Sequence, residues 1–267
     1  MSQQPMRKAG GAFSASHAAL MGRAIDFSQL DPATIPSAYR EAALAAWQER
    51  FETEFRSVQI MTRFMTEVVG AGDPIDVYSM VVDLIEDEVR HAALCGETVR
   101  ALGGTPQLPT PVPLPESDKF LAMPMVQRAM ATAISMLAVN ETLSCGFITD
   151  LAERCQHPVI GAVLQATIED EAEHQELGWL YLKKSMERFP ASSLGAWKRI
   201  TQDALSPQRT AAEAVLKQIP ADKRHLDAWN EPELVEWGLF SPQRQALVYQ
   251  QTWEKDLQPK LKALELI

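Results

Sequence analysis

One seven-residue pattern occurs twice in this chain of 267 residues, and it limits what the chain can fold into. Residues 85–91 and 168–174 both read Ile-Glu-Asp-Glu-x-x-His. A Glu and a His three positions apart project from one face of a helix, one turn from each other. The repeat therefore predicts two helices that each present a carboxylate and an imidazole to a common point.

Hydrophobic spacing places both copies on helices. Apolar residues at steps of three and four predict helices at residues 37–69, 74–102, 124–154 and 160–181. Each apolar stripe is interrupted at one level by a Glu, or by a Glu and a His, where a core residue is expected. These interrupting residues are Glu54, Glu88, His91, Glu141, Glu171 and His174.

A proline-rich stretch separates the two pairs of helices. Five prolines between Gly103 and Asp118 exclude a helix there and favour an extended chain. About fifteen such residues, at roughly 3.1 Å each, can run along the length of a helix. We therefore expect an all-α fold, a four-helix bundle of two hairpins joined by one long crossover. A domain boundary at this stretch is the alternative.

Each predicted hairpin supplies a second carboxylate to its copy of the pattern. In an antiparallel pair, two positions equally far from the turn lie level with each other. The midpoint between Glu54 and Glu88 is Ala71, within the first predicted turn. The midpoint between Glu141 and Glu171 lies within the second turn. Each lone Glu is thus expected beside the Glu-x-x-His of its partner helix.

Four carboxylates at one level of a core require compensation. Each buried carboxylate costs several kcal/mol unless it is paired, and neighbouring carboxylates repel. Two divalent cations would match four negative charges and leave both histidines neutral. Oxygen-rich ligation with one histidine per metal favours iron or manganese over zinc. The alternative, solvated acids on outward faces, fits acids outside the stripes: Glu49, Glu52, Glu86, Glu169 and Glu176.

The sequence resembles the ferritin-like di-iron carboxylate superfamily, in its non-haem di-iron oxygenase and oxidase branch, over about residues 40–185. The resemblance implies a ferritin-like bundle with two iron ions as cofactor; manganese or a mixed iron–manganese pair are alternatives. It also implies that Asp87 and Asp170 hydrogen-bond the metal-ligating histidine of the opposite hairpin. The ligands that it implies are Glu54, Glu88, His91, Glu141, Glu171 and His174.

The same resemblance implies an oxygenase or oxidase that uses dioxygen and a small organic substrate, by hydroxylation, desaturation or N-oxygenation. A ferroxidase, a dimanganese enzyme that disproportionates peroxide and a metal-free scaffold are the alternatives. Cys95 stands where ribonucleotide reductase small subunits carry a radical tyrosine, which argues against a tyrosyl radical. Cys145 stands where the bacterial multicomponent monooxygenases carry a threonine. Apolar side chains suited to a substrate pocket are Phe51, Phe55, Met61 and Met65.

Charge and composition exclude several classes of partner. A net charge of -10 and a pI near 5.1 argue against nucleic acids and anionic membranes. The three cysteines lack CxxC spacing and cannot all pair, which indicates a reducing compartment. We expect no signal peptide or membrane span, and a cytoplasmic location. No flavin, nicotinamide or iron–sulfur motif is visible, so electrons are expected from a separate donor protein or from the substrate.

Three segments are predicted along the chain. Residues 1–36 form an N-terminal arm, residues 37–190 the bundle, and residues 191–267 a helical extension. The extension carries four tryptophans, which are expected to pack it onto the bundle or onto a second subunit of a homodimer. Within it, periodic spacing predicts helices at residues 194–205, 210–219 and 241–264.

Overall fold

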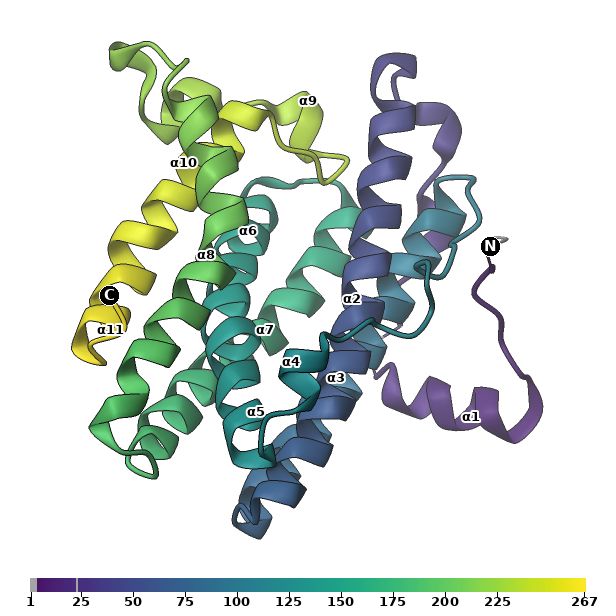
Figure 1. Ribbon diagram of the computed structural model, residues 1–267. Helices are drawn as coiled ribbons and strands as arrows, with labels where there is room; N and C mark the ends of the chain where they lie inside the picture. Colours follow the sequence, from purple (N-terminus) through teal and green to yellow (C-terminus); the bar gives the residue numbers. More distant parts are fainter. Residues whose placement is uncertain (1–3, 23) are drawn as a thin grey trace. The chain divides into compact units, whose positions relative to one another are not determined.

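A computed structural model describes residues 4–22 and 24–267 (Figure 1). Every regular element among these residues is helical, and the two extended segments that pair do so through one isolated bridge between Pro5 and Gln107. The prediction of an all-α protein is confirmed. The chain forms two compact units, and it passes between them several times. The first unit comprises the chain up to Met123, Gln156–Val163 and Glu236–Leu239; the second comprises Pro124–Cys155, Leu164–Val235 and Phe240–Ile267.

The first unit is built on the antiparallel hairpin of α2 (Ser37–Ala71) and α3 (Ile75–Ala101), as Figure 1 shows. Gly72 ends α2 in the left-handed conformation (φ 71°), which glycine adopts without steric cost. The first two predicted helices are therefore confirmed within a few residues. The helices bury large apolar side chains, among them Trp47, Phe51, Phe64, Val81 and Leu84.

The proline-rich linker is extended and runs along α2. The side-chain amide of Gln48 donates to the Gln107 carbonyl (2.7 Å) and accepts from its N–H (3.0 Å). Two turns further along α2, Arg56 Nη1 donates to the Val112 carbonyl at 2.8 Å. These contacts satisfy backbone groups that no helix or sheet could pair. The linker then reaches the short helix α4 (Asp118–Leu121), whose cap is the Ser117 hydroxyl.

The N-terminal part of the first unit contains helix α1 (Gly11–Leu20) and two 3₁₀ turns, Phe27–Gln29 and Pro32–Thr34. An aspartate before each turn accepts a backbone N–H, as expected for Asx-type turns. Leu30 and Ile35 are buried, so the end of this segment is part of the core.

In the second unit, one long helical run replaces the predicted third helix. It consists of α5 (Met125–Thr132), a π-helical stretch (Ala133–Asn140) and α6 (Glu141–Arg154). The predicted fourth helix is α7 (Pro158–Met186), whose first turns to Val163 belong to the first unit. Both helix predictions are confirmed, but the sequence pattern did not indicate the π-helical stretch.

The C-terminal helices of the second unit are α8 (Leu194–Leu216), α9 (Pro232–Val235), α10 (Pro242–Thr252) and α11 (Gln258–Ala263). A π-helical stretch, Trp253–Leu257, joins the last two. Short 3₁₀ turns lie at Ala191–Ser193, Ala221–Lys223 and Leu226–Trp229.

One prediction in this region is wrong. The helices expected at residues 194–205 and 210–219 are the single helix α8, which contains Pro207. A proline removes one backbone hydrogen bond, but here the apolar face continues past it. Trp197 and Leu205 before the proline and Ala212 after it are buried in one hydrophobic core. The burial of this face outweighs the lost bond.

A partly buried charge cluster fixes α10 to α6. The Arg244 guanidinium contacts both carboxylate oxygens of Asp150, the shortest distance being 2.5 Å, and donates to the carbonyls of Leu226 and Trp229. Arg154 also contacts Asp150, at 2.7 Å. A bidentate arginine–carboxylate pair restricts orientation as well as distance. The C-terminal helices thus hold α6 in place.

The two units do not coincide with the three predicted segments. The boundary falls after Met123, so the hairpin α2–α3 lies in the first unit and the C-terminal helices lie with α6 and most of α7 in the second. The assignment of residues 1–36 to an arm, 37–190 to a bundle and 191–267 to a helical extension stays a prediction.

Among the described residues, one helix, Met125–Arg154, is long and apolar enough to cross a membrane by length and composition. More than half of its most apolar stretch, 56%, is buried inside the protein. A core helix of a soluble protein has the same properties, so a single such helix is weak evidence for a span. The three cysteines are free.

The start of α7 depends on a histidine. His157 Nδ1 accepts the backbone N–H groups of Val159 (3.2 Å) and Ile160 (3.3 Å), and its ring packs against Trp237. Burial lowers the pKa of His157, and Glu236 partly opposes this shift. His157 was not among the residues that the sequence singled out, yet its imidazole is half-buried and caps a helix.

This cap predicts a pH dependence of stability. The folded protein holds His157 neutral, whereas the unfolded chain protonates it near pH 6.5, so stability is lost as pH falls below about 6.5. We expect His157→Asn, which keeps a capping acceptor, to reduce this loss by up to about 1 kcal/mol, the usual value of an N-cap. Urea unfolding between pH 5 and 7.5 measures it. His225→Asn, at an exposed position, is the control, and equal slopes for both variants would contradict the assignment.

Candidate metal centre

The first unit contains a buried cluster of two glutamates and one histidine. Glu54 projects from α2, and Glu88 and His91 project from α3. One ligand atom of each lies within 4.8 Å of the others. His91 Nδ1 is 3.8 Å from Glu54 Oε2 and 4.0 Å from Glu88 Oε2. His91 is fully buried, and Glu54, at 9% exposure, is the most accessible of the three.

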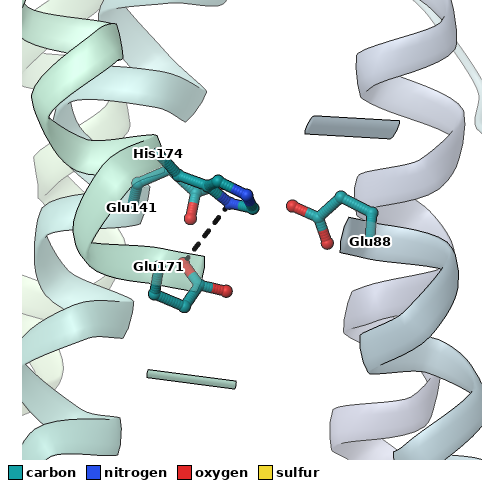
Figure 2. A group of neighbouring side chains, drawn as sticks. All are labelled: Glu88, Glu141, Glu171 and His174. Atoms are coloured by element: carbon teal, nitrogen blue, oxygen red, sulfur yellow. Dashed lines mark ion pairs between the residues drawn. The ribbon is translucent and has the colours of Figure 1, made fainter. Parts of the chain in front are cut away.

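The second unit contains the matching cluster. Figure 2 shows Glu141 of α6 and Glu171 and His174 of α7 gathered in the space beside their helices. Their ligand atoms also lie within 4.8 Å of one another, and His174 Nδ1 is 3.9 Å from Glu171 Oε2. All three side chains are at most 5% exposed. Glu88, also drawn in Figure 2, belongs to the first unit.

The spacing within each cluster suits a metal ion. Separations of 3.8 to 4.0 Å between carboxylate oxygens and Nδ1 are too long for hydrogen bonds. Two protein ligands, each at about 2.0–2.2 Å from one ion, are separated by at most about 4.4 Å. A divalent cation would also remove the repulsion between the two carboxylates of each cluster. Each unit therefore contains a buried Glu and His group that could hold a metal ion, whose identity the residues alone do not define.

The π-helical stretch places Glu141. The Glu141 N–H bonds to the Met136 carbonyl, five residues earlier, so the wider turn ends at the candidate ligand. Such stretches are frequent at functional sites, because they shift the following side chain around the helix. The sequence contains no obvious signal for this feature.

A glycine allows α7 to approach this stretch closely. A Cβ atom on Gly178 would lie 2.4 Å from the Leu137 carbonyl oxygen, which is backbone and cannot move aside cheaply. Gly178 is one helical turn after His174. One further bond holds the same helices together, since Trp179 Nε1 donates to Thr142 Oγ1 at 3.0 Å. Gly178 was not among the residues that the sequence singled out, so its packing role comes from the structure alone.

The acids expected to be solvated are mostly exposed. Glu49, Glu86, Glu169 and Glu176 are exposed, whereas Glu52 is half-buried and accepts from Gln48. Glu67 lies outside the predicted stripe of α2, yet it is 1% exposed. It pairs with Arg63, four residues earlier, at 3.1 Å. The i, i+4 spacing was an available signal for this ion pair, but not for the burial of Glu67.

Asp87 and Asp170 precede Glu88 and Glu171 and are both half-buried. The Asp87 carboxylate pairs with Arg90, one turn further along α3. Their predicted hydrogen bonds to the histidines of the opposite hairpins stay predictions.

The structure also places several other residues that the sequence singled out. Phe51 and Phe55 line a cavity with the N-terminal segment, and Met61 is buried in the core. Burial raises the pKa of the Cys145 thiol, against a hydrogen bond with Thr149 that lowers it. Cys145 is therefore a protonated thiol at neutral pH and a poor nucleophile.

Comparison of the chain with protein-family models, curated proteins and solved structures found no match. No family is therefore assigned, and the described residues define only a broad class of protein. The protein is all-helical and carries buried Glu and His clusters able to bind metal.

The close approach at Gly178 can be tested by adding one methyl group. We expect Gly178→Ala to lower the free energy of unfolding by about 1–3 kcal/mol, because the backbone of the π-helical stretch must move. Gly195→Ala is the matched control, since its Cβ would meet only Arg199 Nη1 at 3.8 Å. It should stabilise α8 by up to about 1 kcal/mol. Equal effects in urea unfolding would contradict the packing role.

Metal binding can be tested with pairs of acids on the same helix. Glu171→Gln removes a candidate ligand, whereas Glu169→Gln changes an exposed acid two residues away. We expect Glu171→Gln to lose at least about half of the bound metal, because each ion would need its carboxylates. Metal analysis of protein from iron-supplemented cells measures this. Glu88→Gln with the control Glu86→Gln repeats the test in the first unit. Unchanged metal content in both ligand variants would refute the assignment.

Proposed function

We propose that this protein is a non-haem di-iron oxidoreductase of the ferritin-like type, which uses dioxygen to oxidise a small organic substrate. The observation that carries the proposal is the occurrence of the same buried ligand set twice. Each set contains one Glu from one helix and a Glu-x-x-His from its neighbour. This set, supplied by each of two hairpins in one bundle, is that of the ferritin-like di-iron carboxylate proteins.

The two sets would form one dinuclear centre. Two carboxylates per ion balance the charge of a divalent cation, and the histidines would bind as neutral imidazoles through Nδ1, the atom nearest the glutamates. This donor set, rich in oxygen, favours iron or manganese. The support for a single centre is the symmetry of the repeat; two separate mononuclear sites are the alternative.

When bound, a ferrous pair supplies the electrons that dioxygen activation requires. The protein contributes the ligands and their surroundings. Each candidate glutamate has two carboxylate oxygens, so it could bind a metal ion through one oxygen or through both as the charge of the site changes. These glutamates are Glu54, Glu88, Glu141 and Glu171. The near-complete burial of His91 and His174 limits the access of water. A protected site favours oxidation of a bound substrate over side reactions.

The partners remain proposals. Electrons beyond the first turnover would come from a separate donor protein or from the substrate. A cytoplasmic location fits the free thiols, and a homodimer is proposed beside it. A ferroxidase and a dimanganese enzyme that disproportionates peroxide use the same ligand types, so they are distinguished by experiment.

The first test asks whether two ions share one centre. Anaerobic loading with ⁵⁷Fe²⁺ should give about two irons per chain, and Mössbauer spectra after oxidation should show a diamagnetic, coupled ferric pair. Glu171→Gln should abolish the coupled signal, and Glu169→Gln should leave it. Two uncoupled ferric sites would contradict a dinuclear centre.

The second test separates the functions. After exposure to dioxygen, an oxygenase keeps about two ferric ions per chain and consumes more dioxygen only when a reductant is added. Continued oxidation of excess ferrous ion, with ferric iron accumulating beyond that number, would indicate a ferroxidase and overturn the proposal. Rapid peroxide breakdown by the manganese-loaded protein alone would equally overturn it.

A further inference from the structure

A cavity of about 320 Å³ lies within the first unit, between the N-terminal segment and the α2–α3 hairpin. Its volume is at the lower end of the range for small-molecule sites, about 300–1,000 Å³. Its floor is apolar and includes Phe51, Phe55 and Val58 of α2 and Ala92 and Ala93 of α3. None of the six candidate metal ligands is among the described residues that line it.

The N-terminal segment is anchored on both sides of this cavity. Met6 packs so closely on Gly96 of α3 that a Cβ there would lie 2.7 Å from the Met6 Cε. The Met6 carbonyl accepts from Arg100, and its N–H donates to the Pro106 carbonyl. At the far end of α1, the Leu20 carbonyl accepts from Arg90 at 3.4 Å. The segment therefore spans the cavity between two fixed points.

Helix α1 itself is held only loosely between these anchors. It has no buried residue, and Phe13, which lines the cavity, is 77% exposed. Glycines with positive φ lie at both ends: Gly10 at 81° before the helix, Gly11 at 55° as its first residue, and Gly22 at 59° after it. A helix with few packing contacts and a glycine at each end can move as a lid.

Positive charge collects at one side of the cavity. Arg7 and Lys8 line it, and Lys8 pairs with Glu97 at 2.6 Å. Glu97 also pairs with Arg100 at 2.9 Å. Two cations thus pair with Glu97, and Arg7 adds a further positive charge at the cavity, on a chain whose net charge is -10. This local excess favours an anionic group over a cationic one.

We propose that this cavity binds a small organic anion with an apolar body, of the medium-chain carboxylate class. The apolar body would lie against Phe51, Phe55 and Val58, and the carboxylate would lie near Arg7 and Lys8. Closure of α1 would then bury Phe13 over the ligand. The inference depends on the first unit alone and needs no metal, so it stands apart from the proposed oxidoreductase function.

The test uses octanoate, titrated into the full-length metal-free protein by isothermal calorimetry. Ser14→Trp fills the cavity from α1, because Ser14 lines it and is half-buried. Ser16→Trp places the same side chain on the exposed face of the same helix. We expect saturable binding of about one octanoate per chain, lost in Ser14→Trp and retained in Ser16→Trp. Val58→Trp, which fills the cavity from α2, should also lose it.

The charge preference has its own controls. Octylammonium, with the same alkyl chain and the opposite charge, should bind at least several-fold more weakly than octanoate. Arg7→Gln should weaken octanoate binding about two- to fivefold, as expected for an exposed ion pair. Arg199→Gln, at an exposed position in the second unit, should not. Absence of saturable octanoate binding, equal binding of octylammonium, or undiminished binding in both filled variants would overturn the proposal.

Discussion

The free-energy cost of burying carboxylates is the constraint on which this structure depends most. Each unit places two glutamates beside a histidine at positions where a helix would otherwise bury apolar side chains. Uncompensated, such groups cost several kcal/mol each, whereas a domain is stable by only about 5–15 kcal/mol in total. A bound divalent cation is the compensation that suits this donor set, since it neutralises the acids and accepts imidazole nitrogen as a ligand.

Two other acids, one buried and one half-buried, are compensated differently. Glu67 pairs with Arg63, and Asp150 pairs with Arg244 in a bidentate contact. Those pairs need no external ion. Arg63 also pairs with Glu116 of the linker, and Arg244 joins α10 to α6. In the Glu and His clusters a buried acid instead meets an imidazole, which binds metal in its neutral form. The contrast within one chain supports separate roles: arginine pairs for architecture, and the Glu and His clusters for chemistry.

Sequence reasoning succeeded where the determining interactions are local. The period of 3.6 residues identified the four long helices, and equal distance from the turn paired Glu54 with Glu88 and Glu141 with Glu171. It failed where distant segments decide the outcome. Two helices were expected at residues 194–205 and 210–219, but the core on which they pack keeps α8 continuous through Pro207.

The order of residues along the chain is enough to identify the helices and the candidate ligands, because helical periodicity and i, i+3 spacing are properties of neighbouring residues. Folding alone establishes which helices touch closely enough to require Gly178, and where a π-helical stretch shifts Glu141. Folding also creates the cavity under α1, since its walls come from residues far apart in sequence. Whether a residue is buried depends on the surface that packs against it, and the local sequence pattern does not specify that surface.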